Sequence, residues 1–328
     1  MEKVKVPSFR VIWNGKDITQ DITPLVKRVV YEDAWEEESD SVEILCENSD
    51  GRWLYSWYPE KGDKIELYFG YEEEKVKAGT FEVDEFEFSG SISGEEIRIK
   101  GLATVLFKPL REKKTRAWEN TSLNQIVSKI AKEHSLNLII DSEDLEVKRI
   151  DQRNEGDWEF LKRLAKDYGK VVKIDGSTLA WIDKERLSRR TPVYTLTREE
   201  IISYTFSDKK HKIYKGIICR YWDAKKKKLF TYREDWKEGK PSSDYLKVQR
   251  KFDSLEEAKR YAKGMRLLYS NSEKTGRIEA VGNPLLIAGQ VIEIKGFGLL
   301  DGNWLIEKSR HSIDFSSGYT TEIGVRKI

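Results

Sequence analysis

The stretch 111-REKKTRAWENTSLNQIVSKIAKEH-134 decides the fold, because the pattern of apolar residues changes within it. We interpret its charged first part, residues 111–120, as a connector. Beyond it, the apolar residues follow helical spacing and form one stripe: Leu123, Ile126, Val127, Ile130, Ala131 and His134. Ser122 and Gln125 have the spacing of a capping box, which predicts that a helix starts here. A domain that contains helices is therefore expected to begin near residue 111.

Before this point, residues 1–110 have the pattern of antiparallel strands. Runs such as SVEILCE, DKIELYFGYE and EEIRIKGLA alternate apolar and polar residues and are separated by turn residues. Asn14 and Gly15 predict a type I′ hairpin turn. The adjacent acids Asp84 and Glu85 interrupt an alternating strand, which predicts a β-bulge. Several short strands at this spacing are typical of a small barrel or a sandwich, and we predict a first β-barrel domain over residues 1–110.

After this point, residues 111–188 predict a small α+β domain. A short strand, LNLIID, follows the first helix, and a second helix is expected at about 155–168. The run KVVKIDGSTLAWID then reads as a strand, an Asp-Gly turn and a strand. The predicted fold class is mixed β with α+β.

A second linker, KERLSRRTP, leads into residues 189–328, which we predict to be a second β-barrel domain. A helical insertion at about 253–270 interrupts it. Asp253 or Ser254 is the expected cap of that helix. Leu255, Ala258, Ala262, Met265 and Tyr269 form its expected buried stripe.

The composition indicates a soluble protein without a dominant charge. The 59 basic and 57 acidic side chains nearly cancel, and no domain stands out as basic, so nucleic-acid recognition is not expected. No apolar run approaches the roughly 20 residues that span a bilayer, so membrane insertion is not expected either. Cys46 and Cys219 lie in separate strand-like runs, where buried, reduced thiols are expected.

The most acidic stretch is 150-IDQRNEGDWEFLKRLAKDYG-169, which first suggests paired catalytic or metal-binding carboxylates. The preferences of residues at helix ends explain most of these acidic and polar residues. Asn154 fits an N-cap, carboxylates in the first turn are favourable, and Gly169 fits the C-terminal end. Asp151 and Gln152 are not explained by capping. Our hypothesis is that they tie the preceding strand to the helix or to a barrel.

No other segment carries a catalytic, cofactor or metal motif. The histidines are scattered: His134 ends a helical stripe, His211 lies in a charged run, and His311 lies in a strand. A spatially assembled triad stays open at this point, but there is no nucleophile elbow, phosphate-binding loop or dinucleotide fingerprint. The run Lys225–Lys228 is most simply the solvated tip of a hairpin. Catalytic residues, cofactors and metals are therefore all predicted as none.

An aromatic cluster in GRWLYSWYPEKGD is formed by Trp53, Tyr55, Trp57 and Tyr58. It has two interpretations: a loop packed on the first barrel, or a contact between subunits, because interfaces are rich in aromatic residues. Both stay open on the sequence alone.

Several stretches, taken in order, resemble one known family. They are NGKDIT, NSDGRW, WYPEKGDKIELYFGY, AGTFEVDEFEFSG, WENTSLNQIVSKIAKEHSL, the acidic stretch, GNPLLIAGQVIEIKGFG, DGNWLIEKSRH and GYTTEI. Their order and spacing over nearly the whole chain resemble the phage late control protein D family, the baseplate hub of contractile tails. The hub half of the type VI secretion spike is similar in fold.

The resemblance implies a non-enzymatic homotrimer in which two related, tail-tube-like barrels per chain form a ring with pseudo-sixfold symmetry. It implies that the ring joins the hexameric tail tube to the trimeric central spike, with contacts to other baseplate proteins and to the tape-measure protein. The expected location is the tail baseplate, after synthesis in the bacterial host cytoplasm. The particle can equally be a phage, a tailocin or another contractile injection system. A peptidoglycan hydrolase and a carbohydrate-binding module of a tail stay open as alternatives.

Overall fold

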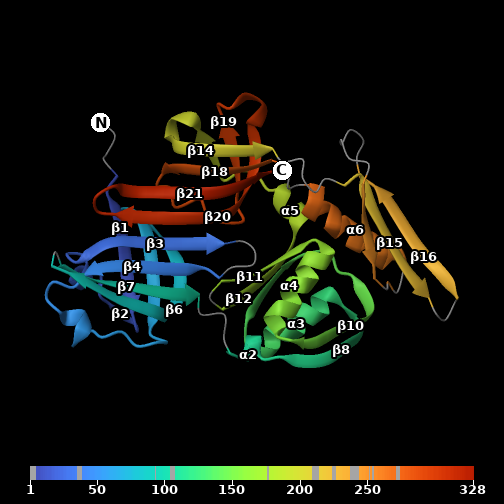
Figure 1. Cartoon of the computed structure of the whole chain (residues 1–328), viewed down its shortest axis with the longest axis horizontal. Helices are drawn as coiled ribbons and strands as arrows, with labels where there is room; N and C mark the ends of the chain where they lie inside the picture. Colours follow the sequence, from blue (N-terminus) through green and yellow to red (C-terminus); the bar gives the residue numbers. More distant parts are fainter. Residues whose placement is uncertain are drawn as a thin grey trace. The chain divides into compact units, whose positions relative to one another are not determined.

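The computed structural model describes the chain except for residues 1–4, 35–38, 93, 104–107, 176, 209–213, 224–226, 237–243, 251, 253–254 and 271–273. The fold is mostly β, as predicted (Figure 1). The chain divides into two compact units. Unit 1 comprises Met1–Leu106, Pro192–Thr205 and Gly276–Val325, and unit 2 comprises Phe107–Thr191, Phe206–Thr275 and Arg326–Ile328.

Unit 1 is built around one 13-stranded sheet with the order β14-β18-β21-β20-β3-β4-β7-β6-β5-β1-β2, while β13 and β19 pair beside β20. Its strands from the first part of the chain are β1 (Pro7–Trp13), β2 (Lys16–Asp17), β3 (Val26–Ala34), β4 (Ser41–Glu47), β5 (Lys64–Tyr71), β6 (Glu74–Ser91) and β7 (Gly94–Ala103). Those from the later part are β13 (Tyr194–Thr197), β14 (Ile201–Asp208), β18 (Lys274–Val281), β19 (Val291–Lys295), β20 (Gly302–Asp314) and β21 (Gly318–Lys327). The short helix α1 (Thr19–Ile22) and the 3₁₀ turns η1 (Arg52–Leu54), η2 (Arg198–Glu200) and η3 (Gly298–Leu300) connect them.

The two predicted β regions meet in this sheet at β3 and β20. These strands are antiparallel neighbours, with Glu32 opposite Arg310 and Tyr31 opposite His311 (Figure 1). The mostly β architecture is thus confirmed. The finer division into two barrels around a small α+β domain stays a prediction.

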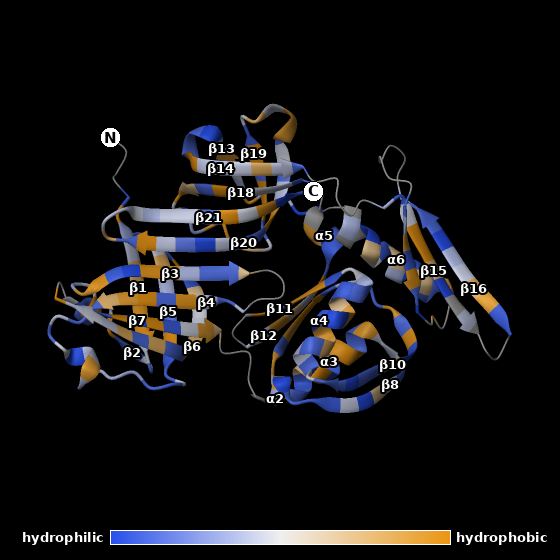
Figure 2. Cartoon of the chain, viewed as in Figure 1, coloured by the Kyte–Doolittle hydropathy of each residue, from blue (hydrophilic) through white to orange (hydrophobic). Residues whose placement is uncertain are grey.

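Local predictions for the first β region are confirmed. Asn14 and Gly15 both have positive φ, at 49° and 82°, as a type I′ turn requires. The register between β6 and β7 shifts between Val83 and Glu85, which is the expected bulge. Alternating side chains of the paired strands form the core, and Figure 2 shows hydrophobic residues gathered on the strands around β4, β5 and β7.

Unit 2 contains the two-stranded sheet of β8 (Lys114–Ser122) and β10 (Glu146–Glu155) and the three-stranded sheet of β11 (Lys170–Asp175), β12 (Thr178–Asp183) and β9 (Asn137–Asp141). Its helices in this part are α2 (Lys108–Arg111), α3 (Leu123–Glu133), α4 (Asp157–Tyr168) and α5 (Lys184–Ser188). The capping box of Ser122 and Gln125 is present, as predicted. The connector predicted at 111–120 is wrong, because most of it forms β8, where Trp118 is buried opposite Ile150. The linker predicted after residue 183 begins with α5 instead.

The remainder of unit 2 is the sheet of β16 (Lys228–Asp235), β15 (Gly216–Asp223) and β17 (Tyr245–Gln249), with α6 (Leu255–Ser270) packed on it. Of the stripe predicted for α6, Ala258, Ala262 and Met265 are buried, whereas Leu255 is 49% exposed at the first helical position. The predicted caps Asp253 and Ser254 lie outside the described residues.

α6 also crosses α4 at very short range. A Cβ on Gly264 would lie 2.6 Å from the backbone nitrogen of Gly169, so this crossing requires glycine. Among the helices of the described residues, none is long and apolar enough to cross a bilayer.

Candidate functional site

The acidic stretch folds as the end of β10 followed by α4. The N-cap of α4 is Gly156, so the cap predicted at Asn154 is wrong. Asn154 instead lies in β10 with a φ of 49°, where the register with β8 shifts between Gln152 and Glu155. A Cβ on Gly156 would lie 2.7 Å from the carbonyl oxygen of Leu110, which explains why glycine occupies the cap. The C-terminal end at Gly169 is as predicted, with a φ of 64°.

Asp157, the first residue of α4, is fully buried and accepts four hydrogen bonds. Lys114 Nζ and His134 Nε2 lie 2.6 and 2.8 Å from Oδ2. Arg116 Nη2 and Gln152 Nε2 donate to Oδ1 at 2.6 and 2.8 Å. Burial alone would raise the pKa of Asp157, but the bonds from His134, Lys114 and Gln152 outweigh it and hold the pKa below its usual value. The carboxylate is therefore kept charged inside unit 2.

Gln152, also fully buried, lies between the strands and this helix. Its Oε1 accepts from Arg116 Nε at 2.8 Å and from Trp118 Nε1 at 3.4 Å. Its Nε2 donates to Asp157 and to the carbonyl oxygen of Glu155, the latter at 3.1 Å. The amide of Gln152 thus forms hydrogen bonds with groups of β8, β10 and α4. That these bonds hold the strands to the helix stays a prediction.

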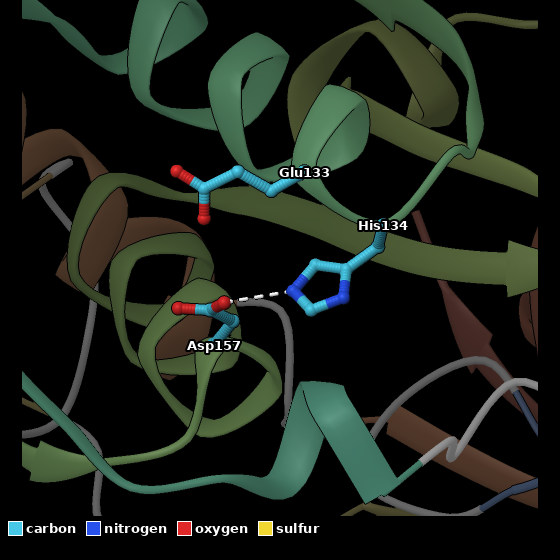
Figure 3. A group of neighbouring side chains, drawn as sticks. All are labelled: Glu133, His134 and Asp157. Carbon is cyan, nitrogen blue, oxygen red and sulfur yellow. Dashed lines mark hydrogen bonds and ion pairs between the residues drawn. The ribbon is translucent and has the colours of Figure 1, made fainter.

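Glu133, His134 and Asp157 form the group in the described residues that most resembles a metal site, because one ligand atom of each lies within 4.8 Å of the others. Figure 3 shows the three side chains turned toward one another. However, Lys114 Nζ lies 2.6 Å from Asp157 and 3.7 Å from Glu133, and Arg116 donates to both Glu133 oxygens. The two carboxylates are balanced by two strong cations, so the group lacks the surplus negative charge that favours a divalent ion. It is best described as an ion-pair cluster.

Asp151 lies apart from this cluster. Its carboxylate pairs with Arg149 at 2.8 Å and Arg153 at 2.6 Å on the surface of β10. Hydrogen bonds from Arg153 and Arg149 hold its pKa below the usual value. Arg163 of α4 donates to the backbone oxygen of Asp151, not to its carboxylate. Any link from this position to the helix therefore runs through the backbone.

The aromatic cluster of unit 1 divides into buried and exposed members. Trp53 is buried in the core and packs edge-on against Trp57, with ring centroids 5.4 Å apart. Tyr55 is 80% exposed. Tyr58 is half exposed and contacts Phe86 and Phe88. Core packing accounts for Trp53, while a subunit contact stays a prediction for Tyr55 and Tyr58.

His311 is a buried group whose position was not anticipated. Its Nδ1 lies 2.9 Å from the hydroxyl of Tyr319 and 3.1 Å from that of Thr321, and its Nε2 lies 3.3 Å from Ser309. Burial lowers its pKa to about 3. No described carboxylate bonds to the ring, so this group is not a Ser-His-Asp arrangement. Its two-residue spacing from Ser309 and Ile313, which are also buried, is the sequence signal of an inward position.

The sequence of this chain matches a defined family over residues 97–316, which is most of its length. The family is described as phage tail baseplate hub (GPD). The chain belongs to this family. The resemblance predicted from the sequence is therefore confirmed, and the function of the family is that of a structural component of the phage tail baseplate.

Individual relatives agree with this assignment. The chain is 24% identical to a probable baseplate hub protein of Escherichia phage 186, and the match covers 96% of this chain and 91% of that protein. A tail protein from Neisseria meningitidis MC58 has a similar fold, with a TM-score of 0.75 at 13% identity, covering 98% of this hub and 97% of that chain. An Escherichia coli component of the type VI secretion system is similar with a TM-score of 0.58 at 14% identity, covering 92% of this hub and 73% of that chain. The last two likenesses concern the fold alone.

Proposed function

We propose that this hub forms a homotrimeric ring with pseudo-sixfold symmetry that joins the hexameric tail tube to the trimeric central spike. A hexameric tube presents six equivalent positions, whereas a trimeric spike presents three. Three chains can match both only if each chain offers two related β regions. The observation that carries the proposal is the continuous sheet of unit 1, to which strands β1–β7 come from one β region and β13, β14 and β18–β21 from the other.

The contact between the two β regions supports the proposal because it is extensive and specific. β3 and β20 pair from Ala34 opposite Lys308 to Arg28 opposite Asp314. Glu32 and Arg310 form an ion pair across these strands at 3.1 Å. A symmetry adaptor needs its two halves at a fixed angle, and hydrogen-bonded strands supply that rigidity.

We further propose that residues 1–110 and 189–328 act as the two tube-like barrels, with 111–188 as a small α+β domain between them. The helical insertion at about 253–270 would belong to a larger insertion in the second barrel, Phe206–Thr275, which lies in unit 2. Tyr55 and Tyr58 are our candidate contact between subunits, because exposed aromatic side chains are favoured at interfaces. The proposal assigns no catalytic residue. The partners would be the spike protein, the tube protein and neighbouring baseplate proteins, including the tape-measure protein, after synthesis in the host cytoplasm.

The test is the mass and shape of the purified full-length hub, alone and with its spike protein. Native mass spectrometry should give three times the chain mass, and electron microscopy should show threefold rings. Tyr55→Ser combined with Tyr58→Ser should shift the mass to that of one chain while the circular dichroism spectrum stays unchanged. Trp222→Ser, which removes an exposed aromatic residue from unit 2, is the matched control and should leave the trimer intact. A wild-type chain that stays monomeric with its spike and is absent from purified tails would overturn the proposal.

A further inference from the structure

The sheet β16-β15-β17 of unit 2 has one covered and one uncovered face. α6 packs against the covered face, where Ile217, Cys219 and Phe252 are buried with the helix residues Ala258 and Ala262. Figure 1 shows α6 beside β15 on this side. Because side chains alternate along a strand, the neighbouring residues of β15, β16 and β17 point to the opposite face.

Apolar and basic side chains occupy this uncovered face in adjacent rows. Trp222 lies opposite Leu229, and the two are 62% and 52% exposed. In the next row, Arg220 lies opposite Thr231 and next to Gln249. One row further, Ile218 lies between Arg233 and Lys247. We name this set the basic face: Trp222, Leu229, Arg220, Arg233 and Lys247.

The charges of the basic face are arranged differently from those of unit 1. There, cations on a strand pair with carboxylates on the next strand, as in Glu87–Arg98, Glu32–Arg310 and Glu322–Arg277. On the basic face, the residues opposite Arg220 and Lys247 are uncharged. No ion pair within the described residues involves Arg220 or Lys247.

Arg233 is the one cation of the basic face with a described carboxylate partner. It pairs with Asp235 on its own strand at 3.3 Å and donates to Tyr245. Opposite charges on neighbouring strands stabilise an exposed sheet face, and two of the three cations of the basic face, Arg220 and Lys247, have no such partner among the described residues.

The composition of the basic face fits a protein partner better than a nucleic acid. A single exposed tryptophan beside a leucine forms a small apolar row, and Arg220, Arg233 and Lys247 follow it in the next two rows along the strands. Tryptophan and arginine are the residues that most often dominate binding energy at protein interfaces. A single-stranded nucleic acid would need several aromatic platforms for stacking successive bases, and Trp222 is the one aromatic side chain on this face that is more than half exposed in the described residues.

We propose that the basic face docks an acidic surface of a different protein of the tail. Trp222 and Leu229 would enter an apolar pocket of that partner, and Arg220 and Lys247 would pair with its carboxylates. The proposal concerns unit 2 alone and is independent of the trimeric ring.

The test uses tails assembled in the host with a photo-crosslinking amino acid, p-benzoylphenylalanine, at position 222 of the full-length hub. Mass spectrometry should identify a crosslink to a segment of another tail protein that contains clustered aspartate or glutamate. The same amino acid at Ile139, which is similarly exposed on β9, is the matched control and should not give this product. Arg220→Glu combined with Lys247→Glu should lower the crosslink yield at least tenfold, and reversing the partner's acids to lysine should restore it.

Folding and assembly are checked separately from docking. Both substituted residues are on the exposed face, so the double variant should keep the circular dichroism spectrum and the native mass of the wild type. A crosslink to a second copy of this chain, to lipid or to DNA would overturn the proposal, as would a yield no higher than at position 139. A hub that fails to form trimers but still gives the acidic crosslink would contradict only the proposed ring.

Discussion

In unit 1 the imidazole of His311 is buried among tyrosine and serine hydroxyls, whereas in unit 2 the carboxylate of Asp157 is buried among cations. Both groups are removed from water, which disfavours their charged forms. Burial keeps His311 neutral and lowers its pKa to about 3, and no described carboxylate bonds to its ring. With Lys114, Arg116 and His134 as partners, Asp157 stays ionised. The surroundings, and not burial alone, decide whether a buried group carries charge.

The two regions are expected to lose stability in different ways. Removing Asp157 leaves Lys114 and Arg116 with Glu133 as their one carboxylate partner among the described residues, and the loss of the buried carboxylate is costly at any pH where the two cations are charged. The side chains that bond to His311 are neutral hydroxyls, so removing it leaves no unpaired charge. At low pH, however, His311 is protonated in the unfolded chain and not in the folded chain, and this favours unfolding. We therefore expect unit 2 to be destabilised mainly by substitution of Asp157 and unit 1 mainly by acid.

The largest effect is expected for Asp157→Ala. Lys114 and Arg116 would lose their shared carboxylate, and breaking such a buried pair costs about 3–5 kcal/mol of unfolding free energy. Urea unfolding followed by circular dichroism measures the change. Glu119→Ala is the matched control, because that carboxylate pairs with Arg149 on the exposed side of β8, and it should leave the midpoint unchanged. A loss below 1 kcal/mol for Asp157→Ala would mean that the cluster is not what holds α4 to the strands.

Gln152→Leu should have the next largest effect. Leucine fits a similar volume but cannot bond to Arg116, Asp157 or the carbonyl of Glu155, and buried polar groups left without partners cost about 1–3 kcal/mol. The double variant with Asp157→Ala should lose less than the sum of the single changes, because both residues belong to one network. Additive losses in the same urea titration would contradict the role of Gln152 as a tie.

Much of the fold was predictable where the signal is local. The helix α3 follows from its apolar spacing and from the Ser122–Gln125 box, and the hairpin at Asn14 follows from its turn residues. The pairing of β3 with β20 was not predictable, because the two strands lie at opposite ends of the chain and neither carries a mark of its partner. β8 was mistaken for a connector because charged residues dominate it, although Trp118 already marks its buried side.

The candidate site was predictable only in part, and for the same reason. The sequence correctly placed Asp157 in the first turn of a helix, but it predicted the cap at Asn154 and not at Gly156. Asn154 is a common N-cap residue, and the sequence does not show that it lies in a bulge of β10. Lys114 and His134 are distant in sequence from Asp157. That they surround one carboxylate depends on how β8, α3 and α4 pack, which residue spacing does not encode.

The free energy of unfolding of unit 1 is expected to fall in acid because of His311. The folded pKa of His311 is lowered to about 3, from an unfolded value near 6.5. The unfolded chain therefore binds a proton that the folded chain does not, and the stability present above pH 6.5 is lost as the pH falls toward 3. The slope approaches about 1.4 kcal/mol per pH unit in this window, which gives about 2 kcal/mol between pH 7 and pH 5.

Urea midpoints at pH 7, 6 and 5 measure this loss for the wild type and for His311→Asn. Asparagine retains hydrogen-bonding groups without a titration in this range, so its stability should fall less steeply than that of the wild type. We expect the variant to be less stable than the wild type at pH 7 because of lost packing. The quantity to compare is therefore the slope of the unfolding free energy against pH. Parallel slopes for the two proteins would show that His311 does not account for the acid sensitivity.

The smallest effect is expected for Asp151→Ala, although Asp151 belongs to the same acidic stretch as Asp157. Its carboxylate pairs with Arg149 and Arg153 at the surface, where water and salt screen such pairs. The bond from Arg163 of α4 is made to the backbone oxygen, which alanine retains. The melting temperature should therefore stay within the scatter of repeated wild-type measurements, and assembled tails should keep wild-type infectivity or killing activity. A clear drop in melting temperature would show that the side chain, and not only the backbone, joins β10 to α4, and it would support the tie that the sequence predicts for this residue.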